Sequence, residues 1–135
     1  MLSEVSRSRN ELVSDRGSGI VGFVLVAPLI VAIFIAIGPI AMLVADKSVL
    51  NSAAVIGART ASAADASNTD GRNAVLKVLA SRGAGFKPEA IIFTQVRSQG
   101  LTYISVSVSR KVAIPLLDRE ILMTGRARAI DEASL

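Results

Sequence analysis

The chain has 135 residues, of which 51% are hydrophobic and 19% charged, and it carries a formal net charge of +4 with no cysteine or histidine. This composition excludes a disulfide framework, thiolate and imidazole metal sites, and the commonest general base. The basic residues are dispersed along the sequence, whereas nucleic-acid-binding proteins carry a basic stripe or patch. The length allows one small domain beside an apolar segment, and we expect no nucleic acid as a partner.

Residues 1–17 form a polar leader with mixed charge and no periodicity, MLSEVSRSRNELVSDRG. Arg7, Arg9 and Arg16 precede the apolar run, whereas only Lys47 and Arg59 lie within a similar distance after it. The positive-inside rule therefore places the N-terminus in the cytoplasm and the rest of the chain outside. A cytoplasmic tail with no specific role fits the charges equally well.

The apolar run that follows, Gly17–Ala45, contains no charged residue. As a helix, Ile20–Ala45 would reach about 39 Å, enough to cross a hydrocarbon core of roughly 30 Å with some tilt. The apolar region of a cleavable secretory signal is shorter, at about 7–15 residues. We therefore predict a transmembrane helix over residues 18–45 that stays in the product. Pro28 and Gly38-Pro39 are expected to kink or locally open it.

The junction between leader and span reads Arg16-Gly17-Ser18-Gly19-Ile20-Val21-Gly22-Phe23, with Pro28 five residues later. It resembles the start of TadE-like pseudopilins of tight-adherence (Flp-type) pili, which belong to the type IV pilin superfamily. A second block, Asn51–Ala61 (NSAAVIGARTA), looks like the Ala-Ala-Arg-Glu-Gly-Ala-Arg stretch of that family. The C-terminal run Gly125–Glu132 is similar as well.

The resemblance implies that a prepilin peptidase cuts between Gly17 and Ser18 and leaves Ser18 as a new N-terminus. Glycine suits such a cut because the peptidase needs a slim, unfolded backbone. Without the resemblance, Gly17 and Gly19 would merely loosen the entry to a transmembrane helix.

Two positions depart from the family pattern: its early Glu is Gly22 here, and its Arg-Glu pair is Val55-Ile56. In the family that Glu is thought to neutralise the new amino terminus of a neighbouring subunit, because a buried amine without a partner is costly. Either this protein assembles only at a tip or in few copies, or it stays in the membrane, or a partner subunit brings the acid. The resemblance still implies that Gly22, Phe23 and Pro28 serve helix packing and assembly.

Beyond the span the sequence predicts an Ala-rich helix at about residues 46–66. Ala53, Gly57 and Ala61 repeat every four residues, and small residues at that spacing let another element approach closely. That element would be the protein's own sheet or another subunit. The alternative is an exposed stalk with high helix propensity.

A second helix is expected at about residues 72–82, with Val75, Leu76 and Leu79 on one face. Lys77 and Arg82 are expected to face water. The turn formers Gly83, Gly85 and Pro88 would end this helix.

From Ile91 onward the apolar period changes from 3.6 to 2. We predict four strands, at Ile91–Arg97, Leu101–Arg110, Val112–Leu116 and Ile121–Ile130, with Pro115 marking a sheet edge or a strand end. In the clearest strand, Ile104, Val106 and Val108 share one face and the alternating serines the other. The Ala-rich helix is the available cover for the apolar face. The predicted fold class is therefore α+β and pilin-like: an N-terminal transmembrane helix continuing into a helix packed on a small antiparallel sheet.

No catalytic group of residues is evident, so we expect no enzyme, no cofactor and no metal. Asp65 with Asp70, and Asp131 with Glu132, are acidic pairs of a kind that is usually solvated.

The expected function is that of a minor pseudopilin or assembly component of a tight-adherence pilus or related secretion system. The expected partners are membrane lipid, prepilin peptidase, other pilin or pseudopilin subunits and the pilus assembly platform. The expected location is the bacterial cytoplasmic membrane, with residues 46–135 outside, and the pilus or cell surface after processing. The alternative is an unprocessed single-span anchor whose outer domain binds an envelope or membrane partner.

Overall fold

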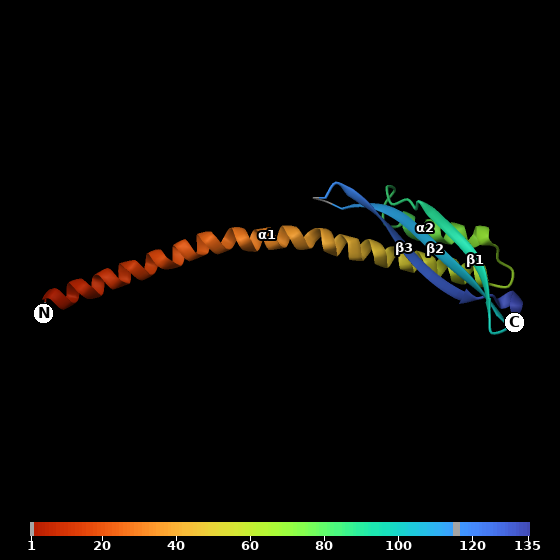
Figure 1. Cartoon of the computed structure of the whole chain (residues 1–135), viewed down its shortest axis with the longest axis horizontal. Coiled ribbons are helices and arrows are strands. Elements are labelled where there is room, and N and C mark those ends of the chain that lie inside the picture. The colour runs from red at the N-terminus through yellow and green to blue at the C-terminus, as the bar shows by residue number, and fades with distance from the viewer. Residues whose placement is uncertain (1, 115–116) are drawn as a thin grey trace. The chain divides into compact units, whose positions relative to one another are not determined.

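The computed structural model describes the backbone of residues 2–114 and 117–135, and the side chains of those ranges apart from residues 2–16 and Ser18. The contacts within the chain divide it into two units, Met1–Ile40 and Ala41–Leu135. Helix α1, Leu2–Ser62, contributes to both units (Figure 1). The class is α+β: a long apolar N-terminal helix and a small antiparallel sheet of three strands.

The first unit consists of the N-terminal part of α1 alone. This helix already begins at Leu2, although the sequence predicted no regular structure for the leader. Both Pro28 and Pro39 lie inside α1, and the helix assignment continues through them. Neither proline ends the helix, and the expected kink or local opening at these positions stays a prediction. A helix tolerates a proline when only one amide donor is lost and the flanking turns keep their own bonds.

Helix α2, Asn68–Ala80, belongs to the second unit and begins four residues before the expected start. The reason is the capping box at its N-terminus: Ser67 accepts a hydrogen bond from the Asp70 backbone N–H, and the Asp70 carboxylate accepts one from the Ser67 N–H. These bonds satisfy two amides that the first helical turn leaves without partners. Val75 and Leu79 are buried as predicted, but Leu76 is wrongly predicted, because it is 40% exposed.

The sheet is a meander in the order β1-β2-β3, with β1 at Ala90–Ser98, β2 at Leu101–Ile114 and β3 at Arg119–Ile130. Gln99 and Gly100 join β1 to β2 with φ angles of 52° and 82°. Two positive φ angles are those of a type I′ hairpin turn, whose twist matches the flanking strands.

The sequence predicted two strands over the residues of β2, and this prediction is wrong. Leu101–Arg110 and Val112–Ile114 belong to one strand, which pairs continuously with β3 as far as Ile114 opposite Arg119. Arg110 interrupts the apolar alternation but not the hydrogen-bond ladder, because its guanidinium pairs with Asp46 and lies over the Phe86 ring. Pro115 lies outside the described residues.

The core of the second unit lies between one face of the sheet and the two helices. Phe93, Val106 and Ala127 stand opposite one another across the three strands, as do Ile91, Val108 and Gly125. Onto this face packs the C-terminal part of α1, through Leu50 and the alanines that follow it. The predicted cover for the apolar sheet face is thus confirmed within this unit.

Candidate membrane segment and helix docking site

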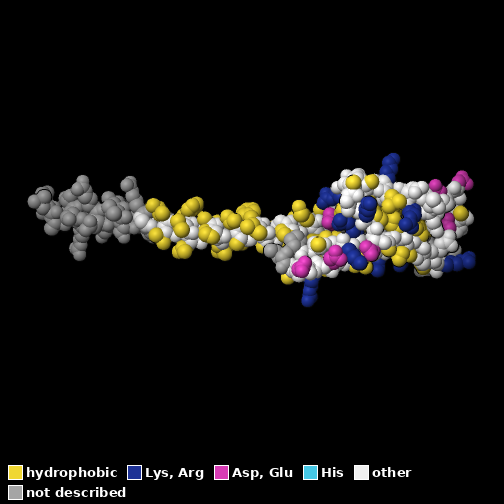
Figure 2. Space-filling view, turned by 90° about the horizontal axis from the view of Figure 1, so that it is seen from above, with side chains coloured by type: hydrophobic (Ala, Val, Ile, Leu, Met, Phe, Trp, Pro, Cys, Tyr) yellow, Lys and Arg dark blue, Asp and Glu magenta, His cyan; other side chains and the backbone are white. Residues whose placement is uncertain are grey.

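The N-terminal part of α1 is long and apolar enough to cross a membrane. The stretch identified by length and composition begins at Gly19, and its most apolar part buries nothing within the chain. Phe23 and Phe34 are each 73% exposed, and Met42 is 70% exposed. Figure 2 shows hydrophobic side chains along this segment and no charged ones. In water such a surface would be costly, whereas a hydrocarbon layer would cover every side of it.

The residues of the expected cleavage site lie at the start of this segment. Gly17 is exposed, and a Cβ atom there would meet no neighbouring atom within 4 Å. The backbone of Gly17 and Ser18 is helical, whereas cleavage by a peptidase requires an unfolded chain. The side chain of Ser18 lies outside the described residues. Gly17 and Gly19 lower the cost of unwinding this turn, since glycine is about 1 kcal/mol less favourable than alanine in a helix.

The other residues expected to serve packing in the span are open to the surroundings. Gly22 has free space where a side chain would stand, and Phe23 points outward. Pro28 is exposed as well. Among the described side chains of the first unit, none packs against these three residues, so the packing role expected for them has no partner there.

Ala53, Gly57 and Ala61, by contrast, are all buried inside the second unit. A Cβ at Gly57 would collide with the Val75 side chain and lie 3.3 Å from the Gly71 carbonyl oxygen. A Cβ at Gly71 would lie 2.7 Å from the Ala61 Cβ and 2.8 Å from the Gly57 carbonyl oxygen. The small residues thus let α1 and α2 touch backbone to backbone, so the closest neighbour is a second helix of the same chain, which was not among the expected elements.

A third close approach joins α1 to the sheet. A Cβ at Gly125 of β3 would fall on the backbone of Leu50 and lie 2.6 Å from the amide nitrogen of Asn51. Beside this contact, the Lys47 ammonium donates a hydrogen bond to the Thr124 carbonyl. The sequence carries no sign of this contact, which depends on how a helix and a strand meet in space.

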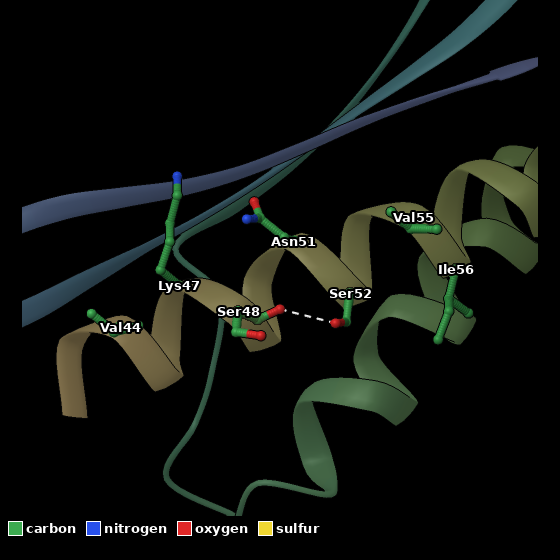
Figure 3. A pocket seen from close by; sticks show the side chains of 7 residues that line it. All are labelled: Val44, Lys47, Ser48, Asn51, Ser52, Val55 and Ile56. Carbon is green, nitrogen blue, oxygen red and sulfur yellow. Dashed lines mark hydrogen bonds between the residues drawn. The ribbon is translucent and has the colours of Figure 1, made fainter. Parts of the chain in front are cut away.

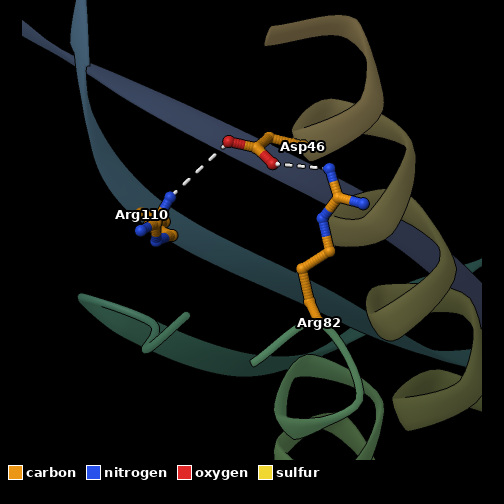
Figure 4. A network of polar contacts seen from close by, with 3 residues as sticks. All are labelled: Asp46, Arg82 and Arg110. Atoms are coloured by element: carbon orange, nitrogen blue, oxygen red, sulfur yellow. Dashed lines mark hydrogen bonds and ion pairs between the residues drawn. The ribbon is translucent and has the colours of Figure 1, made fainter. Parts of the chain in front are cut away.

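An ion-pair cluster holds the start of this helical part to the rest of the unit. Asp46 of α1 lies between Arg82, two residues after α2, and Arg110 of β2, with N–O distances of 3.4 and 3.7 Å (Figure 4). The Arg110 guanidinium carbon also stands 4.1 Å from the centre of the Phe86 ring, a cation–π arrangement. Arg82 is exposed, as expected, and in addition pairs with Asp46.

One carboxylate of each acidic pair, Asp70 and Asp131, takes part in a local hydrogen bond. The hydroxyl of Ser67 hydrogen-bonds to the Asp70 carboxylate and lowers the pKa of that carboxyl, with a further contribution from the Ser67 backbone N–H. Asp131 accepts a hydrogen bond from the Ala133 N–H at the start of the short 3-10 helix Glu132–Ser134. Among the described residues, no three acidic side chains lie close enough together to hold a metal ion.

A shallow groove follows the outward side of α1 in the second unit (Figure 3). Its floor is formed by small and aliphatic side chains, with Lys47 and Asn51 at the side toward β3. The Ser52 hydroxyl donates back to the Ser48 carbonyl at 2.9 Å, so it is not available to a neighbour as a donor. Val55 and Ile56 are 37% and 42% exposed here.

Comparison with known proteins gives no significant match to a family model, a curated protein or a solved structure.

Proposed function

We propose that the protein is a structural subunit, a minor pseudopilin or assembly component of a tight-adherence pilus or related secretion system. One observation carries the proposal: an apolar helix preceded by Gly17-Ser18 leads into a helical part that is buried against a small antiparallel sheet. This order of elements is that of a pilin-like subunit. The role is one of assembly rather than catalysis, and no cofactor is involved.

In this proposal the helix spans the bacterial cytoplasmic membrane once, with the leader inside and residues 46–135 outside. A prepilin peptidase removes the leader after Gly17, and the mature chain meets other pilin or pseudopilin subunits and the assembly platform. The groove beside Val55 and Ile56 supports this role, since an uncharged helix face favours contact with another apolar surface.

A second candidate is an anchor that is neither processed nor polymerised, whose outer domain binds an envelope or membrane partner. Gly22 favours it, because no carboxylate stands there to neutralise the amino terminus of a neighbour. The helical backbone at Gly17 and Ser18 favours it too, since a peptidase would first have to unwind that turn.

The N-terminal residue of the protein isolated from its native membrane distinguishes the two candidates. Mature chains that start at Ser18, together with a Gly17→Leu variant that stays unprocessed, are the result expected for a prepilin-peptidase substrate. A Gly19→Leu variant is the matched control, since it changes a second glycine of the same junction and leaves the cut site in place. Wild-type chains that start at Met1 would contradict the pseudopilin proposal and favour the anchor.

A further inference from the structure

The end of the β2–β3 hairpin extends beyond the rest of the sheet. Strand β1 pairs with β2 only as far as Ser109, whereas β2 and β3 continue to pair up to Ile114 and Arg119. Residues 110–114 and 119–123 therefore form a two-stranded ribbon, called here the terminal ribbon. A two-stranded ribbon alone in water is at best marginally stable, so a surface that supports it is expected.

Hydrophobic side chains are exposed on both faces of the terminal ribbon. Ile121 and Leu122 are neighbours in β3, so they point to opposite faces, and they are 38% and 60% exposed. Leu117, in the described part of the connecting turn, is 63% exposed. The same strands carry serines on their outward face farther along, at Ser105 and Ser107, where the sheet meets water. On the same face β3 changes from Arg126 and Arg128, opposite these serines, to Leu122 in the terminal ribbon, which indicates a different environment.

The terminal ribbon points toward the apolar end of α1 within the second unit. Gly125 packs against Leu50, and three residues earlier along both elements Leu122 lies beside Lys47 in one shallow depression. From Leu122 to Arg119 the strand advances about 10 Å, the length of about six to seven helical residues. The ribbon thus reaches the level of Ala41–Ala45, the last residues of the uncharged run.

We propose that the terminal ribbon inserts Leu117 and Leu122 into the interfacial layer of the membrane that α1 crosses. This inference depends on the membrane span of the proposed function. If Ala41–Ala45 lie at the edge of the hydrocarbon, side chains at the same level meet the boundary between headgroups and acyl chains. The exposed charges of Asp118, Arg119 and Glu120 limit the insertion to that boundary, where charged groups keep their hydration.

The absence of native cysteine allows a direct test with single-cysteine variants of the full chain. Leu117→Cys and Leu122→Cys would each carry an environment-sensitive fluorophore in nanodiscs that hold one copy of the protein. Nitroxide lipids labelled either at the headgroup or deep in the acyl chain act as quenchers. Gln99→Cys, in the turn at the other end of β2, is the control that should stay in water. Phe34→Cys, within the apolar segment, reports the membrane span itself.

The expected result is loss of fluorescence at positions 117 and 122 with the headgroup nitroxide, less loss with the deep nitroxide, and none beyond background at position 99. Loss at position 34 with the deep nitroxide but none at 117 and 122 would overturn the ribbon proposal and leave the span standing. No loss at position 34 would contradict the span, and with it the proposed function. Quenching at position 99 equal to that at 117 would also overturn the proposal, because the whole domain would then lie on the bilayer.

Discussion

At the scale of single residues, the second unit depends on a few glycines where backbones meet. We expect Gly125→Ala to destabilise the fold by about 1–3 kcal/mol or more, because the new methyl group would overlap backbone atoms, which cannot move aside as a side chain can. Chemical unfolding in detergent micelles measures the change.

Gly85→Ala is the matched control for this prediction. A Cβ at Gly85 meets no atom within 4 Å, and its φ is not in the left-handed region. We expect the control to unfold within about 0.5 kcal/mol of the wild type. Equal stability of the two variants would show that Leu50 does not lie as close to β3 as described.

The carboxylate of Asp46 is a second residue on which several elements depend. It is 17% exposed and serves Arg82 and Arg110 together, so Asp46→Asn leaves two arginines without their anion. We expect a loss of about 1–3 kcal/mol, the range for a hydrogen bond to a charged group. Glu89→Gln breaks the pair with Lys111, whose side chains are 52% and 55% exposed, and should cost less than about 1 kcal/mol.

Urea unfolding at low and at high salt tests the Asp46 prediction. The deficit of Asp46→Asn should persist in larger part at high salt, because the Asp46 and Arg110 side chains are only 17% and 24% exposed, while any effect of Glu89→Gln should disappear. Equal, salt-sensitive effects would place Asp46 among ordinary surface pairs.

At the scale of elements, the start of α2 gives a prediction about pH. The Ser67 hydroxyl, followed by its backbone N–H, holds the pKa of Asp70 below its ordinary value of 3.8. A carboxyl with a lowered folded pKa stabilises the fold fully above its unfolded pKa, and this contribution disappears as the pH falls through the folded pKa. We therefore expect Asp70→Asn to lower the Tm at neutral pH and to approach the wild type below pH 3.8.

Thermal melts followed by circular dichroism across this pH range measure the effect. Asp65→Asn, in the preceding turn, is the control, because this carboxylate is not part of the capping box of Ser67 and Asp70. Ser67→Ala should cost about 1 kcal/mol as the loss of an N-cap. A deficit of Asp70→Asn that stayed constant down to pH 2 would contradict the assigned role of the carboxylate.

The elements themselves could largely be predicted from the sequence, because each has a periodicity that burial enforces. Val75 and Leu79 indicated the buried face of α2, and the alternation around Val106 indicated the covered face of β2. The end of β2 could not be predicted, since Arg110 and Lys111 together read as an interruption, while Val112–Ile114 continue the strand only through their pairing with β3.

Contacts between elements were the part that sequence reasoning missed. The spacing of Ala53, Gly57 and Ala61 predicted a close approach but left the approaching element open, because a small residue does not specify its neighbour. The pairing of Asp46 with Arg82 and Arg110 had no sequence signal at all: the three residues are brought together only when α1, the loop after α2 and β2 pack.

At the scale of the molecule, the two units differ in what they need from their surroundings. All buried members of the core cluster lie between Leu50 and Val108, and the charged residues begin again at Asp46. We therefore expect a fragment of residues 46–135 to remain in solution without detergent and to unfold cooperatively, whereas the full chain partitions into membranes.

Circular dichroism and denaturant titration of the fragment test this expectation, with Gly125→Ala introduced into the same fragment as the control. The substitution should destabilise fragment and full chain alike if the fragment keeps the packing of α1 on β3. A fragment without a cooperative transition would show that the apolar segment contributes to the fold of the second unit.

The contacts at Gly57 and Gly125 have a mechanical consequence. From Asp46 to Gly57, α1 runs past β2 from the level of Arg110 to that of Val106, so helix and strand lie side by side and run in opposite directions. A force applied along α1 would therefore load the glycine contacts and the Asp46 ion pairs in shear and all at once, rather than peel them apart in turn. We therefore expect the second unit to resist a force along α1 better than a force that separates α1 from the sheet.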